Sequence, residues 1–223
     1  MKAIGDIIKD MDMQTSDAPE PTPEQREAEA KRRQEEDRRR QQEYQKRLHR
    51  DRYERDCPPL YQQTDPARLP PDKLKAVLGW RYGPRGLLLV GKTGAGKSRC
   101  AWQLIRRLTV DEGRHVRAFD GIGWGVAVSA AFGDPQTTET WLDRVCKADV
   151  LFIDDLFKVK FTEAQEQGIY GVFERRAAYM RPIIATMNTT GELLLARMTE
   201  QGRADRGEPL IRRMRDFCQI ITF

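Results

Sequence analysis

The sequence predicts an α/β fold in which helices cover both faces of a parallel β-sheet. Five short apolar runs have the length and composition of buried strands. Segments with the apolar spacing of helices separate these runs, most clearly 97–108 and 162–179. Strands that alternate with helices are typical of a parallel sheet, because each connection must return to the other end of the sheet. The five predicted strands are 86–90, 116–119, 150–153, 182–186 and 219–223.

The composition predicts one globular domain with appendages, since 223 residues with 39% hydrophobic content can bury one sizeable core. The four cysteines stand far apart without a histidine cluster, which indicates reduced thiols rather than zinc ligands. No apolar run approaches the roughly 20 residues that cross a bilayer, and no signal peptide is evident. We therefore expect a soluble, cytoplasmic protein. Its net charge of +5 is compatible with nucleic-acid binding but does not identify a partner.

The N-terminal part of the chain divides into two segments. Residues 1–23 carry an apolar stripe at helical spacing, from Ile4 to Met11, followed by a Pro-rich linker. A helix this short must dock on its own core or on a partner. Residues 24–56 are almost wholly charged or glutamine, and their acidic-to-basic i,i+4 pairs favour a solvated helix. Because the a/d seam of a coiled coil is absent, a spacer is favoured over a dimerisation rod.

A glycine-rich loop follows the first predicted strand. The segment LLLVGKTGAGKS holds the phosphate-loop pattern G-x-x-x-x-G-K-[ST] between a strand and a helix, which is the context that the pattern requires. Its glycines let the backbone approach a phosphate, and the helix beginning near Lys97 adds the positive end of its dipole. We expect Lys97 to bridge the β- and γ-phosphates of ATP and Ser98 to ligate Mg²⁺. The predicted nucleotide-binding residues are Gly91, Lys92, Thr93, Gly94, Ala95, Gly96, Lys97 and Ser98.

Two consecutive carboxylates, Asp154 and Asp155, close the third predicted strand in the run ADVLFIDDLF. Charges at the end of a buried strand cost stability unless a cation or a partner offsets them. In a parallel sheet this strand and the phosphate-loop strand end at the same edge, where ligands of such folds bind. We assign Asp154 to Mg²⁺, directly or through water, and Asp155 to polarising the attacking water. The alternative for Asp155 is the N-cap of the next helix.

A third polar element follows the fourth predicted strand in the run IIATMNTTGELL. The strand brings Asn188 to the same sheet edge, where its amide could orient the lytic water. The alternative is an ordinary cap or turn residue. Thr189 or Thr190 can cap the helix that follows.

A short arginine-rich helix in the run GEPLIRRMRDF precedes the last predicted strand. Arg212, Arg213 and Arg215 could be plain surface charge. Phosphoryl transfer, however, gains about 10³- to 10⁵-fold from an arginine at the γ-phosphate, and this helix offers the candidates.

With these four elements in this order, residues 57–223 resemble an AAA+ ATPase of the DnaC-like helicase-loader branch, which includes the IstB-type transposition helpers. The segments that carry the resemblance are GKTGAGKS at 91–98, LFIDDL at 151–156, ATMNTTGELL at 185–194 and GEPLIRRMRDF at 207–217. The resemblance implies a three-layer P-loop NTPase domain with a five-stranded parallel sheet. It also implies that the domain lacks a C-terminal helical lid, since the sequence stops at the strand after the arginine helix.

The resemblance also implies roles for individual residues. Lys97 and Ser98 would belong to the Walker A motif, and Asp154 with Asp155 to the Walker B motif. Asn188 would be the sensor 1 residue. The finger inserted into a neighbouring subunit would be Arg213, with Arg212 as its rival. One departure is that Asp155 stands where many relatives have glutamate, although the shorter acid should still reach a water.

By this resemblance the chain would be an ATP-dependent helicase loader. It would hydrolyse ATP with Mg²⁺, assemble head to tail on single-stranded DNA through the trans arginine, and hold a replicative hexameric helicase through its N-terminal region. The segment 121–134 with Trp124 is a candidate DNA contact or, alternatively, a core helix. Two other functions stay open. One is an IstB-like transposition helper that binds duplex DNA, and the other is a non-hydrolysing adaptor that uses nucleotide only to fold or dock.

Overall fold

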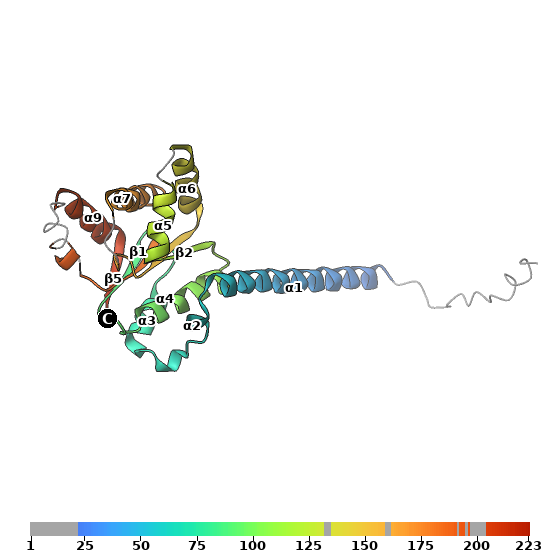
Figure 1. Ribbon diagram of the computed structural model, residues 1–223. Helices are drawn as coiled ribbons and strands as arrows, with labels where there is room; N and C mark the ends of the chain where they lie inside the picture. The colour runs from blue at the N-terminus through green and yellow to red at the C-terminus, as the bar shows by residue number, and fades with distance from the viewer. Residues whose placement is uncertain (1–21, 132–134, 159–161, 191, 195, 197–203) are drawn as a thin grey trace, which may run out of the picture. The chain divides into compact units, whose positions relative to one another are not determined.

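The computed structural model describes residues 22–131, 135–158, 162–190, 192–194, 196 and 204–223 (Figure 1). The five predicted strands form one parallel sheet in the order β2-β3-β4-β1-β5. Their bounds differ from the predicted ones by at most one residue, which confirms the α/β class. The strands are β1 Gly86–Val90, β2 Val116–Asp120, β3 Val150–Asp154, β4 Ile183–Met187 and β5 Cys218–Thr222.

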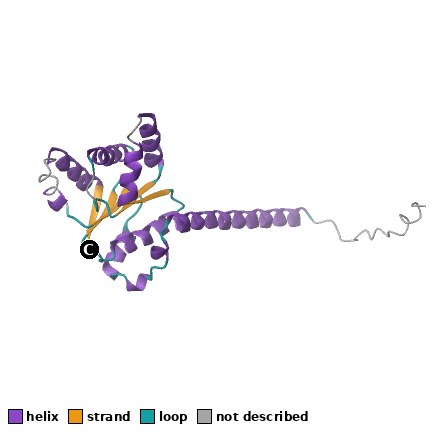
Figure 2. Ribbon diagram, in the orientation of Figure 1, coloured by secondary structure: helices purple, strands orange, loops and turns teal. Residues whose placement is uncertain are grey.

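Helices cover both faces of this sheet (Figures 1 and 2). The helices α5, α6, α7 and α9 cover one face, whereas α3 and α4 lie on the other. The strand order places β1, which leads into the phosphate loop, between β4 and β5. The helical segments are α1 Pro23–Asp56, α2 Pro59–Gln62, η2 Pro66–Arg68, α3 Pro71–Gly79, α4 Lys97–Arg106, η3 Arg107–Asp111, α5 Gly121–Ala131, α6 Pro135–Lys147, α7 Glu163–Ala178 and α9 Ala204–Phe217.

Two hydrophobic cores lie on the two faces of the sheet. Along β1, Leu87 and Leu89 point into the core beneath α4, and Leu88 and Val90 point into the core beneath α5, α7 and α9. All residues of β1, β3 and β4 are buried, as expected for parallel strands covered on both faces. This burial explains why these strands read as continuous apolar runs.

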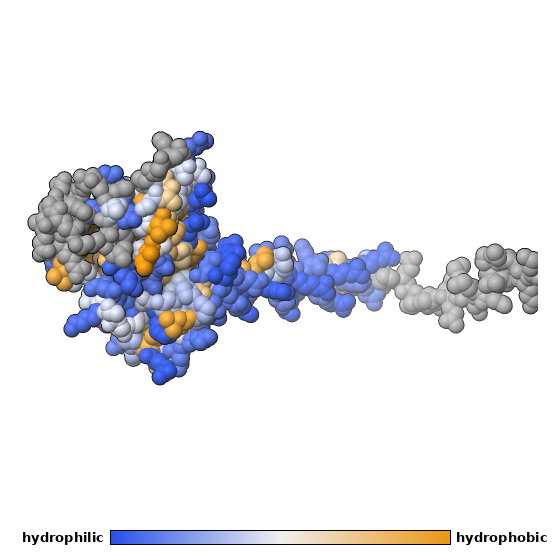
Figure 3. Space-filling view, in the orientation of Figure 1, coloured by the Kyte–Doolittle hydropathy of each residue, from blue (hydrophilic) through white to orange (hydrophobic). Residues whose placement is uncertain are grey.

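The chain divides into two compact units, residues 1–44 and 45–223. In the first unit the described residues begin with a capping box, in which Gln25 N–H donates to Thr22 Oγ1 (3.3 Å) and Thr22 N–H donates to Gln25 Oε1 (2.8 Å). Side chains from 22 to 48 are exposed, and Figure 3 shows α1 as almost wholly hydrophilic. The apolar stripe predicted for the first residues lies outside the described part of the chain.

The helix α1 carries ion pairs along its exposed length. Three of the predicted i,i+4 pairs are present, Glu27–Lys31 at 2.7 Å, Glu29–Arg33 at 2.7 Å and Glu35–Arg39 at 3.6 Å. Exposed pairs of this kind contribute about 0.3–0.5 kcal/mol each. The helix is therefore held by many weak local interactions.

Among the described residues no helix combines the length and apolar character that a membrane span requires. The four cysteines are free and buried. The segment 121–134 includes α5, whose Trp124 is fully buried between Phe119 and Trp141, with ring centroids 5.4 Å from each. Of the two alternatives for this segment, the core helix is the one present, and Trp124 is not a DNA contact because a buried indole cannot stack on a base. The exposed face of α5 carries Ile122 and Val126 (Figure 3).

Candidate nucleotide-binding site

The phosphate loop connects β1 to α4 at the carboxyl edge of the sheet. Gly96 has φ = +93°, a left-handed conformation that side chains with a Cβ rarely adopt, and it allows α4 to begin at Lys97. A Cβ on Gly91 would lie 2.6 Å from the carbonyl oxygen of Phe223, so the loop also needs glycine where the chain passes β5. The helix N-terminus therefore opens onto the loop, as the sequence pattern predicted.

Lys97 is the buried cation of this site, with a side chain that is 4% exposed. Its ammonium donates to the carbonyl oxygens of Gly91 (2.9 Å) and Lys92 (2.8 Å) and to Asn188 Oδ1 (2.8 Å). Burial lowers the pKa of Lys97, and the charges of the two nearby aspartates oppose that shift. All three hydrogen-bond acceptors are neutral, so the ammonium retains the capacity to bind an anion such as a phosphate.

Asp154 is the buried acid at the end of β3, 8% exposed. Its Oδ1 accepts a hydrogen bond of 2.6 Å from Thr186 Oγ1, and the hydroxyls of Ser98 and Tyr61 lie near enough to its carboxylate to influence its pKa. Burial raises the pKa of Asp154, and the three hydroxyls counteract the shift by stabilising the charged form. Ser98 and Asp154, which the sequence assigned to Mg²⁺, therefore lie close together.

Asp155 points into the same site from a left-handed backbone conformation with φ = +55°. Asparagine and aspartate tolerate this conformation better than other side chains that carry a Cβ. Its Oδ1 accepts from Asn188 Nδ2 (3.1 Å) and its Oδ2 from Lys158 Nζ (3.0 Å). The alternative role as a helix N-cap does not hold, because the N-cap of α7 is Thr162, which forms a capping box with Gln165.

Asn188 lies between the cation and the second acid. Its Oδ1 accepts from Lys97, and its Nδ2 donates to Asp155. Because the two ends of one amide are held by opposite charges, its orientation is fixed. The helix cap is supplied by Thr190, whose Oγ1 accepts from the N–H of Leu193 (3.3 Å). The fold thus brings together five of the predicted residues, namely Lys97, Ser98, Asp154, Asp155 and Asn188.

The two arginines proposed for the finger lie on α9, away from this cluster of contacts. Arg213 forms an ion pair with Glu174 of α7, and its guanidinium lies 5.7 Å from the ring centroid of Phe217. Arg212 is exposed. Neither arginine is bonded to the phosphate loop of its own chain in the interactions that the described residues show, which is compatible with a role in a neighbouring subunit.

Sequence reasoning missed two residues of the site. Thr186 is a fully buried β4 residue whose hydroxyl donates to Asp154 and accepts the backbone N–H of Asp155 at 2.7 Å. Within an apolar strand such a threonine reads as an ordinary β-branched residue. Tyr61 comes from a turn-rich passage with no recognisable pattern. A polar residue inside an otherwise apolar strand beside a catalytic edge is the one signal that could have pointed to Thr186.

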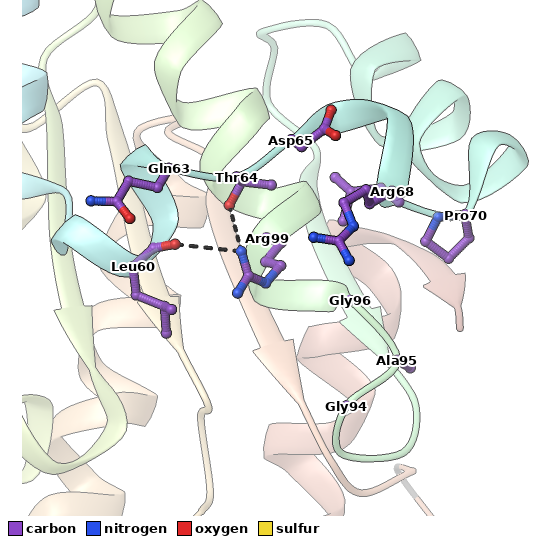
Figure 4. Close-up of a pocket in the computed structure, with 11 residues that line it drawn as sticks. Leu60, Gln63, Thr64, Asp65, Arg68, Pro70, Gly94, Ala95, Gly96 and Arg99 are labelled. Carbon is purple, nitrogen blue, oxygen red and sulfur yellow. Dashed lines mark hydrogen bonds between the residues drawn. The ribbon is translucent and has the colours of Figure 1, made fainter.

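A cavity of about 530 Å³ opens beside the phosphate loop (Figure 4). One wall is the turn between α2 and α3, and the other is the loop with the first turn of α4. Arg99 of α4 donates to Thr64 Oγ1 (3.0 Å) and to the carbonyl oxygen of Leu60 (3.4 Å), which fixes the turn against the helix. The lining residues are Leu60, Gln63, Thr64, Asp65, Arg68, Leu69, Pro70, Gly94, Ala95, Gly96 and Arg99.

The donor set suits magnesium together with phosphates. Within the described ranges no group of three or more His, Cys, Asp or Glu side chains could hold a metal by itself. Magnesium prefers oxygen ligands and is commonly held by one or two protein groups with phosphates and waters completing its shell. Ser98 Oγ and the carboxylate of Asp154 fit that arrangement.

Comparison with known proteins begins with the sequence. No model of a known protein family matches the chain. The chain is 28% identical over 120 residues to the uncharacterized protein YdaV of Escherichia coli (strain K12), across 50% of this chain and 48% of YdaV. The match therefore spans about half the length of that curated relative.

Solved structures match a larger part of the chain than this relative does. A primosome component from Streptococcus pyogenes superimposes with a TM-score of 0.57 at 17% identity, over 75% of this chain and 89% of that one. DnaI gives 0.52 at 17% identity (72% and 86%), and the DnaC helicase loader gives 0.51 at 19% identity (67% and 85%). AMPPCP-bound DnaA from Aquifex aeolicus gives 0.52, but only 44% of that chain is matched. The chain therefore shares its fold with these solved structures, DnaI and the DnaC helicase loader among them.

Proposed function

We propose that this chain is an ATP-dependent helicase loader, which binds and hydrolyses ATP, assembles on single-stranded DNA and delivers a replicative hexameric helicase. The observation that carries the proposal is the chain of hydrogen bonds from Lys97 through Asn188 to Asp155, beside the neighbouring pair Ser98 and Asp154. The fold shared with DnaC and DnaI supports the same conclusion.

ATP binding relies on the phosphate loop and Lys97. The ammonium exchanges its neutral acceptors for phosphate oxygens, which are stronger partners because they carry charge. The N–H groups of the loop and the first turn of α4 supply further donors. The cavity beside Gly96 is large enough for the nucleoside, and its polar groups, among them Arg68 and Thr64, are candidates for contacts with the base and ribose.

Hydrolysis relies on the acids and on Asn188. Magnesium, held by Ser98 and Asp154, would neutralise charge on the phosphates. Asp155 accepts the proton of the attacking water, and Asn188 orients that water from the side of Lys97. Lys158 Nζ donates to one oxygen of Asp155 at 3.0 Å and so helps to hold this carboxylate in position. Aspartate is shorter than the glutamate of many relatives, so the position of its carboxylate matters more. The hydrogen bond from Asn188 to Asp155 fixes how far that carboxylate extends toward the water.

Thr186 is predicted to position both acids through one hydroxyl. Replacing Thr186 by valine removes the donor to Asp154 and the acceptor for the N–H of Asp155, so we expect ATP hydrolysis to fall by about 10- to 100-fold. Loss of the hydrogen bond also raises the pKa of Asp154 further, and the acidic limb of the pH–rate profile should move to higher pH. Phosphate release measured across pH checks both effects.

The matched control is Thr186→Ser, which keeps the hydroxyl. It should retain most of the activity and the wild-type pH profile. An unchanged pH profile in Thr186→Val, with only a loss of stability, would mean that Thr186 is a packing residue and does not orient the acids.

Helicase binding is assigned to the N-terminal region 1–23, whose apolar stripe suits a partner's groove. The test is recovery of partners on the immobilised full chain with ATP and Mg²⁺, beside a variant with Ile4 and Ile8 changed to aspartate. We expect the full chain to retain a hexameric helicase and the variant to lose it. Recovery of a transposase, with duplex DNA bound more tightly than single strands at equal salt, would favour the transposition-helper function instead.

A further inference from the structure

The first residue of α5, Gly121, lies directly against the backbone of the second acid. A Cβ on Gly121 would lie 2.4 Å from the carbonyl oxygen of Asp155 and 3.2 Å from its carbonyl carbon. The helix follows β2, which pairs in parallel with β3 so that Asp120 lies opposite Asp154. The φ of Gly121 is not positive, so glycine is needed here for space rather than for backbone conformation.

The carbonyl oxygen of Asp155 closes the turn that follows β3. It accepts the backbone N–H of Lys158 at 3.0 Å, and Lys158 Nζ donates to Asp155 Oδ2, also at 3.0 Å. From the side of β4, the N–H of Asp155 donates to Thr186 Oγ1 at 2.7 Å. Displacement of this carbonyl would therefore disturb the turn and the carboxylate together.

Asp155 needs such support because its backbone is left-handed, with φ = +55°. This conformation is unfavourable for a residue that carries a Cβ, and it persists where the surrounding contacts determine it. Thr186 restrains Asp155 from the side of β4, and Gly121 restrains it from the side of β2. Between these two contacts the acid has little freedom to move.

Two buried glycines of α5 differ in what they contact. Gly121 is held in place by the residue before it, since Asp120 Oδ1 accepts the N–H of Gly123 at 2.6 Å, as an N-cap does. A Cβ on Gly125 would instead lie 3.1 Å from Gln165 Nε2, the end of a flexible side chain on α7. Only the first of the two glycines therefore bears on the acid.

We propose that Gly121 is a positioning residue for Asp155. It lets the start of α5 lie against the Asp155 carbonyl and so holds the carboxylate where it can take the proton of the attacking water. This role rests on the proposed function, because that function makes Asp155 the proton acceptor. The start of α5 thus belongs to the hydrolytic site although Gly121 supplies no side chain.

The first test is Gly121→Ala in the full chain. An ordinary contact begins at 3.4 Å, so the Asp155 carbonyl must move by about 1 Å, and a misplacement of that size can lower a rate by about 10²-fold. We expect kcat for phosphate release to fall by about 10- to 100-fold, while an ATP analogue binds with Mg²⁺ within about threefold of the wild-type affinity. Gly125→Ala is the matched control, since it adds the same methyl group to the same helix away from the acids. Its kcat should equal that of the wild type.

The second test is a double-mutant cycle. If Gly121 acts through Asp155, Gly121→Ala should have little further effect on hydrolysis in a chain that already carries Asp155→Asn. A packing residue would lower the rate by the same factor in both backgrounds. That equal factor, or a wild-type kcat in Gly121→Ala alone, would rule out the positioning role.

The third test needs no nucleotide. Loss of the hydrogen bond to Thr186 should speed amide exchange of Asp155 in Gly121→Ala by about 10-fold relative to the amides of β3, with no change in Gly125→Ala. Unchanged exchange at Asp155 would overturn the proposal. A wild-type chain that fails to hydrolyse ATP would overturn the proposed function but leave this measurement intact, so the two failures are distinguishable.

Asp120→Ala takes the place of Gly121→Ala if that variant does not fold, since Asp120 is exposed. Loss of the N-cap frees the first turn of α5, so exchange at Asp155 should rise and kcat should fall by about 3- to 10-fold. Asp120→Asn is the matched control, because asparagine keeps a capping oxygen and should behave like the wild type. Equal losses in the two variants, or none in Asp120→Ala, would contradict the contact through Gly121.

Discussion

Replacing Arg213 by alanine is expected to lower the rate of ATP hydrolysis by about 10³-fold or more while ATP binding persists. An arginine at the γ-phosphate stabilises charge that develops only in the transition state, so its loss affects kcat rather than nucleotide affinity. Steady-state phosphate release and equilibrium binding of an ATP analogue measure the two quantities separately. Arg212→Ala is the matched control from the same helix, and its hydrolysis should stay within a few-fold of the wild type. A large loss of hydrolysis in Arg212→Ala with little loss in Arg213→Ala would assign the finger to Arg212.

The trans arrangement can be tested by mixing two inactive variants. Arg213→Ala subunits keep Asp155, and Asp155→Asn subunits keep Arg213, so a mixed assembly rebuilds intact sites where the two meet in the right order. At equal amounts about one quarter of head-to-tail interfaces are intact, and activity should return to about that fraction. No recovery on mixing would contradict a finger that acts between subunits.

The ion pair between Arg213 and Glu174 must break if Arg213 is to act on a neighbouring subunit. An arginine that reaches a neighbour's phosphate must leave this ion pair, which is partly exposed and therefore weak. On the proposed role of Arg213 as the finger, Glu174 would hold it in the isolated subunit at little cost. A triphosphate carries more negative charge than one carboxylate, so we expect it to compete successfully for Arg213.

The electrostatics of the site oppose folding. Burial lowers the pKa of Lys97 and raises the pKa of Asp154, so both groups are shifted toward their neutral forms. The charge on Lys97 therefore lowers the free energy of unfolding at low pH, and this cost is relieved as the pH rises through the folded-state pKa of Lys97. The charge on Asp154 lowers the free energy of unfolding at high pH, and this cost is relieved as the pH falls through the folded-state pKa of Asp154. A bound anion and cation would relieve the two costs together. This opposition is typical of sites arranged for a ligand rather than for stability.

Much of the fold could be predicted because its signals are local. The five strands are continuous apolar runs, and the phosphate loop combines glycines with a lysine at fixed spacing. Parallel topology predicted that Asp155 and Asn188 lie at the edge that carries Lys97, and hydrogen bonds join these three residues in the structure. Each inference needed only residues close in sequence and one rule about sheets.

The remaining residues could not be found in this way, since their roles arise between distant segments. Tyr61 lines a cavity together with Asp154 at the end of β3 and Asp155 just after it, and Thr186 of β4 is hydrogen-bonded to both acids. Trp124, interpreted as a candidate base contact, packs on Trp141 of the next helix. Aromatic and β-branched residues are common in every core, so composition alone cannot tell a site residue from a packing residue.

Arg176 of α7 is the largest such omission, because nothing in the run FERRAAYM marks it out from its neighbour. It is fully buried, and burial lowers its pKa to about 10. Its guanidinium donates to the backbone carbonyls of Val145 (2.8 Å), Ala148 (3.0 Å), Asp149 (3.0 Å) and Pro182 (2.8 Å). These carbonyls lie at the end of α6 and just before β3 and β4. One side chain therefore ties together the starts of the two strands whose far ends carry Asp154 and Asn188.

Arg176→Met is therefore expected to lower the free energy of unfolding by about 3–5 kcal/mol, because four buried carbonyls lose their donor. Arg176→Lys keeps the charge but cannot reach four acceptors arranged for a planar guanidinium, so an intermediate loss is expected. Arg175→Met is the matched control next along the helix. Arg175 forms an exposed pair with Glu139 at 3.1 Å, and its loss should cost at most about 1 kcal/mol. Urea denaturation of the three variants measures these differences, and equal losses at 175 and 176 would contradict a structural role for the buried guanidinium.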